Sequence, residues 1–302
     1  MNILVTNDDG FDSPLFQVLV KTLKKKKWVS SVYPVVPSSE RSWIAGAVSK
    51  HGNRYIRTRL KDETKYLLLE GTPADCTSIG IGNLYPGTID LVISGINFGS
   101  NAGLAFHCSS GTVAGARQAA FFGVQGVALS CALKPEIFNL WKTRDFNSLS
   151  NFSDYFNALA EYQVNLTGHL VNIGLFGRNQ INKSFNPLKP NQDIPIPDYA
   201  SLNSPSDFKD EPPVVCNLKS TRFNPIFIKE RDYVYSHKFQ GFAGDYEEKF
   251  DPDNPEDLTA VRSGKHSLTL FNLEAENAII KADGYCRRLK YYQDLVNLGY
   301  SK

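Results

Sequence analysis

The stretch Met1-Asn-Ile-Leu-Val-Thr-Asn-Asp-Asp-Gly10 leads an apolar run directly into two adjacent carboxylates, Asp8 and Asp9, and a glycine. The apolar run has the length and composition of a buried β-strand. An open α/β sheet binds its ligands outside the carboxyl ends of its strands, which is where the two aspartates would lie. The stretch therefore predicts an α/β protein with a functional site directly after its first strand.

The two aspartates alone allow two interpretations. Two carboxylates about 5 Å apart repel each other by roughly 3 kcal/mol at an effective dielectric of about 20. A divalent cation beside them turns this repulsion into attraction, and hard oxygen ligands suit Mg²⁺ or Mn²⁺. Alternatively, Asp9 and Gly10 simply form a turn. The rest of the chain has to decide between the two.

Strand-like and helix-like segments alternate over residues 1–175. Leu15, Leu19 and Leu23 recur every four residues, which predicts an amphipathic helix. Alternating strands and helices indicate an α/β fold with a largely parallel sheet. The expected strands are 2–7, 29–36, 89–94, 126–132 and 170–175, the expected helices are 13–27, from 72, from 110 and around 152–163, and 44–70 is expected to hold short strands and hairpins.

The composition changes after residue 175. Residues 184–213 carry seven prolines, which predicts a long loop or an insertion at about 176–213 rather than a packed element. Strand-like segments return at 214–218, 227–235 and 267–271. Apolar residues spaced 4-3-4-3-4 predict a final helix over 274–298. That helix either docks on its own domain or faces a second chain, and the sequence leaves both open.

The overall composition disfavours several classes of protein. The chain has 302 residues, 42% of them apolar and 21% charged, which is ordinary for a globular protein. A net charge of +2 gives no reason to expect nucleic acid or an anionic membrane as a partner. The five cysteines show no CxxC spacing, and no apolar stretch has the length of a membrane span or a secretion signal. We therefore expect a reduced, cytoplasmic protein.

Four clusters of polar residues and glycines are expected at the carboxyl edge of the sheet. Each has an ordinary structural alternative, since Asn97 and Asn101 can hold turns and Ser110 can simply cap a helix. Neither GxGxxG nor GxxxxGK[ST] occurs, which disfavours a dehydrogenase and a P-loop NTPase. The clusters are Asn7-Asp-Asp-Gly10, Pro37-Ser-Ser-Glu-Arg-Ser42, Ser94-Gly-Ile-Asn-Phe-Gly-Ser-Asn-Ala-Gly103, whose part from 95 to 103 is expected to be a loop, and Ser110-Gly-Thr112.

Together the four clusters favour a site for a divalent cation beside a phosphate. Two carboxylates, neutral oxygen donors and a helix N-terminus would meet at one edge of the sheet. A cation held there polarises a phosphoryl oxygen and activates water, which is the chemistry of metal-assisted phosphate ester hydrolysis. No histidine is an obvious general acid, and His107 is a candidate.

The motifs in these clusters, in this order, resemble the SurE family. The combination of NDDG, SGxNxGxN and SGTV is highly specific and outweighs the interpretation of Asp8 and Asp9 as a mere turn. Residues 257–270 also resemble the family's late segment, so the resemblance covers nearly the whole chain outside 176–213. The motifs are ILVTNDDG at 3–10, PSSERS at 37–42, GTPADC at 71–76, SGINFGSN at 94–101 and SGTVAGA at 110–116.

The resemblance implies a metal-dependent phosphomonoester hydrolase, a nucleotidase or acid phosphatase acting on nucleoside monophosphates with one Mg²⁺ or Mn²⁺. It implies a single Rossmann-like α/β domain over 1–302, with a projecting β-hairpin, a C-terminal helix and an oligomerisation region at about 225–302 that serves homodimers or homotetramers. Carried over position by position, the catalytic residues are Asp8, Asp9 and Asn97, the metal ligands are Asp8, Asp9, Ser42 and Asn97, and the phosphate-binding residues are Asn101, Ser110, Gly111 and Thr112.

Three positions depart from the family pattern, although the implied metal ligands are intact. Leu15 replaces a usual glycine, Ser109 a residue that is often aromatic or histidine, and Gln118 a common glutamate. The mechanism stays open between direct attack of water on phosphorus and a transient aspartyl-phosphate on Asp8 or Asp9. The alternative function is a sensor on the same fold that binds a nucleotide or metal without turnover.

Overall fold

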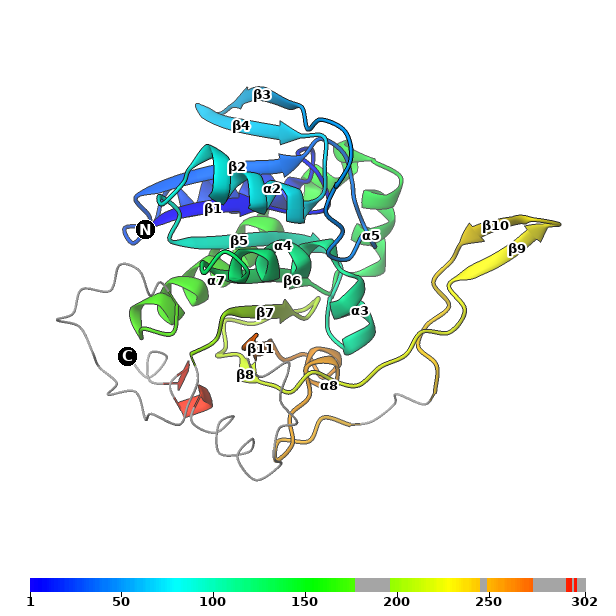
Figure 1. Ribbon diagram of the computed structural model, residues 1–302. Coiled ribbons are helices and arrows are strands. Elements are labelled where there is room, and N and C mark those ends of the chain that lie inside the picture. Colours follow the sequence, from blue (N-terminus) through cyan, green and yellow to red (C-terminus); the bar gives the residue numbers. More distant parts are fainter. Residues whose placement is uncertain (177–195, 245–248, 274–291, 295, 298–302) are drawn as a thin grey trace.

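The computed structural model describes residues 1–176, 196–244, 249–273, 292–294 and 296–297 (Figure 1). The strands are β1 Asn2–Thr6, β2 Ser31–Pro37, β3 Ile56–Lys61, β4 Thr64–Leu69, β5 Leu91–Phe98, β6 Gln125–Cys131, β7 Tyr199–Ser204, β8 Val214–Val215, β9 Phe227–Arg231, β10 Val234–His237 and β11 Ser267–Phe271. The α-helices are α1 Pro14–Leu23, α2 Pro73–Ile79, α3 Leu104–Ser109, α4 Gly111–Ala120, α5 Pro135–Lys142, α6 Phe146–Leu149, α7 Ser153–Asn172 and α8 Asp257–Arg262.

A nine-stranded sheet in the order β3-β4-β2-β1-β5-β6-β7-β11-β8 forms the centre of the described part of the chain. The strands from β4 to β7 in that order pair in parallel, whereas β3 and β11 pair antiparallel with β4 and β7. The predicted α/β fold with a largely parallel sheet is confirmed. The chain adds β2 on one side of β1 and β5 on the other, so the β1–β5 boundary is a topological switch point, where such sheets bind ligands.

Helices cover both faces of this sheet (Figure 1). Ile3 and Val5 of β1 belong to an apolar core with α1 and α7, whereas Leu4 packs on the other face with α2 and α4. All three side chains are fully buried. Successive side chains of a strand point to opposite faces, so a strand covered on both faces has to be apolar throughout. This explains the continuous apolar run that precedes Asp8.

The predicted helix starts at 72 and 110 are confirmed, each by a side-chain cap. The Thr72 hydroxyl accepts a hydrogen bond from the Asp75 N–H at 3.1 Å, and the Asp75 carboxylate accepts one from the Thr72 N–H at 2.9 Å. The Ser110 hydroxyl accepts a hydrogen bond from the Val113 N–H at 3.0 Å. The helix predicted over 13–27 ends at Leu23, before the lysine run. Side-chain oxygens at these positions satisfy N–H groups that the helix itself leaves unpaired.

The strand predicted at 170–175 is wrong. Residues up to Asn172 belong to α7, and a turn follows the helix. Leu170 and Leu175 are buried in the apolar core. A short apolar run of this kind is compatible with a buried helix end as well as with a strand, so periodicity alone could not separate them.

The insertion predicted at 176–213 is wrong over the residues of β7. This six-residue strand is buried throughout and pairs with both β6 and β11. Pro197 and Pro205 stand just outside its ends, where a missing N–H does not interrupt the ladder. The high proline content of the surrounding segment therefore concealed a strand of the central sheet. Residues 177–195 lie outside the described residues, and a single domain over 1–302 stays a prediction.

The segment predicted as one strand at 227–235 forms two, β9 and β10, which pair antiparallel and project from the body of the protein (Figure 1). This agrees with the projecting hairpin that the resemblance implies. Most of the helix predicted at 274–298 lies outside the described residues. Tyr292 and Val296 are buried in the main core, and the Val296 carbonyl lies 3.1 Å from Nε2 of His169. These described residues therefore dock on the chain's own core.

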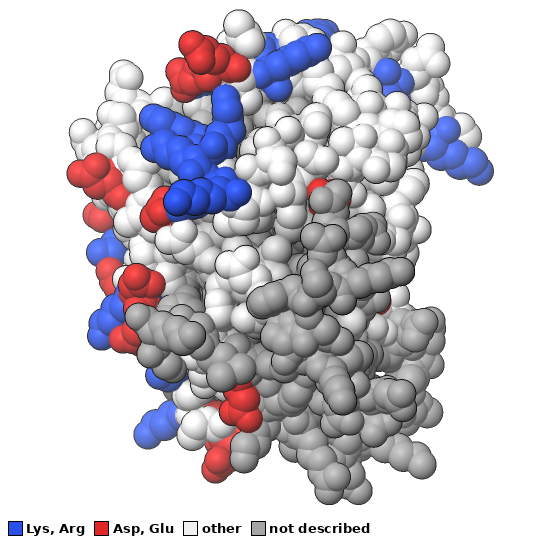
Figure 2. Space-filling view, turned by 90° about the vertical axis from the view of Figure 1, so that its left-hand side faces the viewer, with Lys and Arg blue, Asp and Glu red and all other residues white. Residues whose placement is uncertain are grey.

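Lysine and arginine side chains gather on part of the face shown in Figure 2, at the amino ends of the parallel strands. A hollow of about 380 Å³ at that end is lined by Lys24, Lys65 and Tyr85 among other residues. This charge lies away from the carboxyl ends of β1 and β5. No helix among the described residues is both long and apolar enough to span a membrane.

Candidate functional site

Asn7 builds the turn that follows β1. Its side-chain oxygen accepts a hydrogen bond from the Gly10 N–H, and its side-chain nitrogen donates one to the Gly10 carbonyl, both at 3.1 Å. Gly10 has a φ of +86°, and a Cβ there would lie 3.3 Å from the backbone nitrogen of Glu40. Glycine is suited to both conditions. The turn fixes Asp8 and Asp9 at the carboxyl end of β1, at the switch point of the sheet.

Asp8 lies against the start of α4. Its side chain is buried, and Oδ1 accepts a hydrogen bond from the Thr112 hydroxyl. A Cβ on Gly111 would lie 2.8 Å from the Cβ of Asp8, so the close approach requires glycine. The Asp8 carbonyl accepts a hydrogen bond from the Arg41 N–H at 2.6 Å. The structure thus brings together the end of β1, the segment 37–42 and the start of α4.

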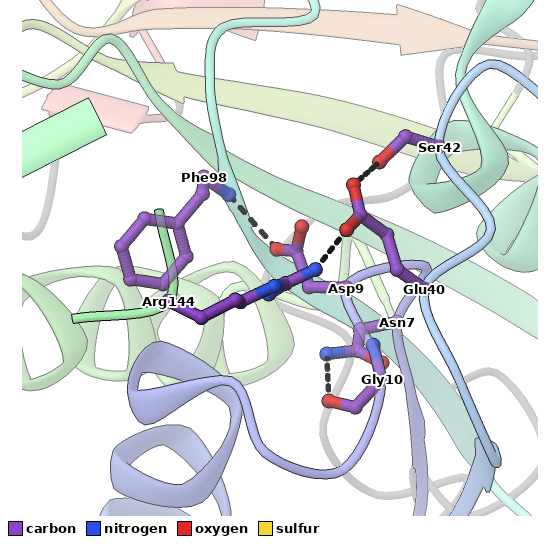
Figure 3. Close-up of polar contacts among 7 residues, drawn as sticks. All are labelled: Asn7, Asp9, Gly10, Glu40, Ser42, Phe98 and Arg144. Atoms are coloured by element: carbon purple, nitrogen blue, oxygen red, sulfur yellow. Dashed lines mark hydrogen bonds and ion pairs between the residues drawn. The ribbon is translucent and has the colours of Figure 1, made fainter. Parts of the chain in front are cut away.

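Asp9 lies against the end of β5. Its carboxylate is buried, and Oδ2 accepts a hydrogen bond from the Phe98 N–H at 3.0 Å (Figure 3). Within the described part of the chain, Oδ1 of Asp9 has no hydrogen-bond partner, and neither Asp8 nor Asp9 forms an ion pair with a lysine or arginine. The two adjacent carboxylates are therefore buried without a cation of the chain in contact with them.

Burial raises the pKa of both carboxyl groups. The pKa of Asp8 rises to about 6 because burial disfavours its charged form, and the hydrogen bond from Thr112 offsets part of this effect. The pKa of Asp9 rises well above its usual range because of burial and, second, the negative charge of Asp8. A buried pair of like charges is unfavourable unless a cation accompanies it. A divalent cation would relieve both causes at once.

Asn97 reaches this edge of the sheet through an irregularity in β5. Ser94 pairs with Ala128 and Asn97 with Ser130, so β5 holds one more residue than β6 between these pairs. Such a bulge changes the direction in which a strand presents its side chains. The strand therefore continues to Phe98, where a loop was predicted from residue 95 onward. The amide nitrogen of Asn97 donates to the Gly99 carbonyl at 2.9 Å, which leaves its side-chain oxygen available as a ligand.

Gly95 makes this bulge possible. Its φ is +136°, and a Cβ would lie 2.3 Å from the Leu129 carbonyl oxygen of β6. A larger residue would clash with that backbone, so the glycine in Ser94-Gly95 serves close strand packing.

Ser42 contacts the site through Glu40. The Ser42 hydroxyl is exposed and donates a hydrogen bond to Oε1 of Glu40 at 2.8 Å (Figure 3). The other carboxylate oxygen of Glu40 pairs with Arg144, whose guanidinium lies 3.9 Å from the ring centroid of Trp141. Glu40 belongs to the segment 37–42 singled out in the sequence, whereas nothing in the sequence marks Arg144, which approaches from the end of α5.

The amide of Asn101 lies in a buried network rather than at an open surface. Its Nδ2 donates to the Ser130 hydroxyl at 2.8 Å, and its backbone N–H donates to Oδ1 of Asn203 at 2.7 Å. Asn203 is fully buried at the end of β7 and also accepts a hydrogen bond from the Ser100 hydroxyl at 3.2 Å. Asn203 therefore holds the loop after β5. The sequence does not point to it, because the proline-rich composition around β7 predicts an insertion.

Asp257 supports the same loop from the other side. Its Oδ2 accepts a hydrogen bond from the Gly103 N–H at 2.8 Å, and its Oδ1 accepts from the N–H groups of Lys219 and Leu258, both also at 2.8 Å. Burial raises the pKa of Asp257 to about 6 in spite of these donors. Its place in the segment 257–270 was the only signal for it in the sequence.

His107, the candidate general acid, is a core residue. It is 4% exposed, its Nε2 lies 3.3 Å from the Tyr199 hydroxyl, and its ring lies 4.4 Å from that of Phe271. Burial lowers its pKa to about 3, so the imidazole is neutral. No contact connects it with Asp8 or Asp9 among the described residues.

The donor set at the switch point suits a hard divalent cation. It offers two buried carboxylates, the side-chain oxygen of Asn97 and the hydroxyl of Ser42. Mg²⁺ and Mn²⁺ bind oxygen ligands of this kind and retain several waters, so few protein ligands suffice. Among the described residues no group of three or more histidine, cysteine, aspartate or glutamate side chains could hold a metal ion, so neutral oxygens would have to complete any site.

Comparison with known proteins points to one family. The family model described as "Survival protein SurE" matches residues 3–223. A protein of Leptospira interrogans named 5'-nucleotidase SurE is 30% identical over 281 residues, which cover 91% of this chain and 92% of that protein.

Two further similarities differ in extent. A 5'-nucleotidase SurE of Pseudothermotoga lettingae is 38% identical over 158 residues, 52% of this chain, and this chain spans only 58% of that relative's length. The crystal structure of a SurE protein from Aquifex aeolicus shares the fold with a TM-score of 0.62 at 23% identity, covering 97% of this chain and 100% of that one.

Proposed function

The chain belongs to the survival protein SurE family, and from this premise we propose that it is a metal-dependent phosphomonoester hydrolase acting on nucleoside monophosphates. The observation that carries the proposal is the buried pair Asp8 and Asp9, which lies at the switch point beside the start of α4 and has no ion pair with a lysine or arginine among the described residues. Two relatives bear the name 5'-nucleotidase, which agrees with this activity.

The cation site would be formed by Asp8, Asp9, Asn97 and Ser42. When bound, one Mg²⁺ or Mn²⁺ neutralises the charge that develops on the phosphoryl oxygens and activates water for attack. Asp8 and Asp9 supply the negative charge, and their hydrogen bonds with Thr112 and Phe98 fix their orientation. Ser42 would have to exchange its bond with Glu40 for the cation.

The phosphate would bind at the N-terminus of α4. Ser110 caps this helix through the Val113 N–H, and the first N–H groups of a helix form a ready site for an anion. Gly111 lacks a side chain where one would collide with Asp8, so the start of α4 lies directly against this carboxylate, and a bound phosphate would be next to the cation. Thr112 links the cation ligands to the phosphate position at the start of α4 through its hydrogen bond with Asp8. Asn101 would act by shaping the loop, because its amide is bound to Ser130.

The exposed β9–β10 hairpin supports a homo-oligomer. Phe227, Tyr233 and Tyr235 are 57%, 98% and 60% exposed on a hairpin that extends away from the body. Aromatic side chains are frequent at interfaces between proteins, and an isolated hairpin is marginally stable in water. A second copy of the chain would bury these rings, as a homodimer or homotetramer.

We place the enzyme in the cytoplasm. Cys76, Cys108, Cys131 and Cys216, which are the cysteines of the described residues, are free thiols. Free thiols are typical of a reducing compartment.

The test is release of inorganic phosphate from nucleoside monophosphates and from 4-nitrophenyl phosphate, with Mg²⁺ or Mn²⁺ and again after chelation. We expect release that chelation abolishes and either metal restores. A folded protein that binds a nucleoside monophosphate but releases no phosphate with either metal would contradict the proposal and favour a sensor.

A further inference from the structure

Six aromatic rings meet beside the segment that carries Ser42. They come from three parts of the chain: the loop after β2, the helix α3, and the segments at the base of the β9–β10 hairpin. Their ring centroids lie between 4.8 and 6.1 Å apart in ten pairs. We call these rings the aromatic cluster: Trp43, Phe106, Phe223, His237, Phe239 and Phe242.

Trp43 connects these parts. Its ring lies 4.8 Å from that of His237, 5.1 Å from that of Phe223 and 5.6 Å from that of Phe106. Its backbone has a φ of +61°, which is rare for a bulky side chain and persists only where surrounding contacts impose it. The aromatic contacts therefore hold the indole in one place against a backbone preference.

The aromatic cluster borders the phosphate position proposed above. Trp43 directly follows Ser42, and Cγ2 of Ile44 lies 3.0 Å from where a Cβ of Gly111 would be, beside Asp8. The Ala45 N–H donates to the Ser109 carbonyl at 3.0 Å, immediately before the cap of α4. Phe106 lies about one helical turn before Ser110. The cluster is thus next to the start of α4 on the side of Ser42.

Part of the aromatic cluster faces solvent. Trp43 is 36% exposed, Phe239 is 41% exposed, and His237 is also exposed. The ring of Trp43 makes edge-to-face and tilted contacts with its neighbours, and its exposed part can contact a further planar group. The guanidinium of Arg262 lies over the ring of Phe242, 5.9 Å from its centroid, whereas no charged group among the described residues lies over the ring of Trp43. A neutral planar aromatic group is therefore the ligand that this surface suits.

We propose that the aromatic cluster binds the base of the nucleoside monophosphate whose phosphate lies at the start of α4. This inference rests on the proposed function and names the part of the substrate that determines specificity. Stacking on an aromatic side chain tolerates every base, because each base has a π-face. The enzyme therefore prefers phosphate esters of nucleosides or aryl groups to aliphatic phosphate esters and discriminates weakly between bases.

The experiment compares three variants on two classes of ester. Trp43→Gly removes the indole and places at φ +61° the residue that adopts this conformation most easily, so the loop can keep its shape. Trp43→Phe restores an aromatic ring at the same position. Phe121→Ala removes a ring that is 61% exposed at the far end of α4 and serves as the matched control.

We expect kcat/KM for adenosine and cytidine 5'-monophosphates to fall roughly 5- to 100-fold in Trp43→Gly, from the strength of base stacking. The value for ribose 5-phosphate should stay the same within about twofold, since that ester has no base to stack. Trp43→Phe should recover most of the loss, and Phe121→Ala should match the wild type on every ester.

An equal loss on nucleotides and on ribose 5-phosphate would overturn the proposal, because it would mean that Trp43 only positions Ser42. Unchanged kcat/KM of Trp43→Gly on every ester would also overturn it. So would a smaller particle mass of this variant in sedimentation together with equal losses of kcat/KM on all esters, because the cluster would then be an interface between copies of the chain. If Trp43→Gly does not fold, Phe239→Ala takes its place with the same expectations.

Failure of the proposed function is a separate result. If the wild type releases no phosphate from any ester, calorimetric titration with adenosine decides the present inference alone. Binding to the wild type that Trp43→Gly loses supports the aromatic cluster as a base site, whereas equal binding or none overturns it.

Discussion

Two buried aspartate sites accept backbone N–H groups from the stretch 98–103 but differ in how many hydrogen bonds their carboxylates receive. Asp257 accepts three backbone N–H groups, one of them from Gly103, and so binds α8 and the segment at Lys219 to the loop after β5. Asp9 accepts one N–H, from Phe98, and has the buried carboxylate of Asp8 as its neighbour in sequence. The residue type and the degree of burial are the same, but the number of donors is not.

This difference separates a structural carboxylate from one that is ready for a ligand. Hydrogen bonds from backbone N–H groups replace the hydration that a carboxylate loses on burial. Asp257 has such partners on both oxygens, so a cation has little to add. Asp8 and Asp9 have fewer such partners, since Oδ1 of Asp9 has none among the described residues, and the two carboxylates repel each other. The folded chain without a cation therefore holds unfavourable free energy at this point. The two sites should therefore respond to substitution with opposite signs.

The largest effect is expected from Asp9→Asn. Metal-dependent phosphate release should fall on the order of 100- to 1000-fold or more, because one charged ligand is lost where transition-state charge is neutralised. The amide oxygen can still accept the Phe98 N–H. Without metal the variant should be more stable than the wild type, because one of two repelling charges is gone. Phosphate assays and urea unfolding after chelation measure the two effects.

Asp12→Asn is the matched control for this variant, since the Asp12 side chain is 71% exposed and, among the described residues, forms an ion pair with Arg59 alone. It should leave both phosphate release and stability unchanged. A fully active Asp9→Asn enzyme would remove Asp9 from the site.

The second effect is a loss of stability in Asp257→Ala. Three backbone N–H groups lose a buried acceptor, so the free energy of unfolding should fall by about 3 kcal/mol. Asp253→Ala, at an exposed position before α8, is the control and should change stability by less than about 0.5 kcal/mol. Urea unfolding of chelated protein gives both values. If Asp257→Ala stabilised the protein instead, the Asp257 carboxylate would not be a structural group, and the two sites would not differ in this respect.

The third effect is a pH dependence of the stability that the metal-free protein gains from Asp9→Asn. The pKa of Asp9 is raised in the folded state by burial and by Asp8, so the folded protein binds this proton more readily than the unfolded chain. Stability from such a group is fully present below its unfolded pKa and is lost as the pH rises through the folded pKa. The wild type without metal should therefore approach the variant in stability as the pH falls from 8 toward 5.

Unfolding of both proteins in chelator across this pH range measures the difference. An amide and a protonated carboxyl are both uncharged, so the difference in the free energy of unfolding between the variant and the wild type should vanish at low pH. If this difference stays constant from pH 8 to pH 5, the charge of Asp9 does not destabilise the folded protein.

The smallest effect is expected from Arg144→Met. The pair of Arg144 with Glu40 is 38% and 40% exposed, and exposed ion pairs contribute about 0–1 kcal/mol. The positive charge of Arg144 also lowers the pKa of Asp9, as the last of its causes. We therefore expect nearly unchanged stability and a tightening of Mg²⁺ or Mn²⁺ binding by a few-fold, because a positive charge that repels the cation is removed; titration calorimetry measures the binding. A loss above about 2 kcal/mol would show that the pair is structural.

Most of the fold could be predicted because its signals are local. Three signals each lie within a few residues: the run before Asp8, the capping residues Thr72 and Ser110, and the apolar run from Ile89 that contains the start of β5. β7 could not be predicted in the same way, because its six residues stand among prolines and are buried only through pairing with β6 and β11.

The same difference between local and long-range signals applies to the site residues. Asp8, Asp9 and Thr112 were expected together, and their contacts agree, because motifs at strand ends and a helix start meet wherever the sheet is parallel. Asn203 and Asp257 were missed, since each acts on a loop about 100 or more residues away in sequence, at Asn101 and Gly103.

The α/β class, the position of the carboxylates after β1 and the resemblance to one family can all be read from the sequence alone. Periodicity, capping and short motifs are properties of neighbouring residues, so no tertiary contact is needed to see them. Three features depend on the folded chain: which buried carboxylates have too few donors, the bulge of β5 at Gly95, and the rings from three segments that gather around Trp43. These depend on what the folded chain places around each group, and burial and hydrogen bonding are defined only there.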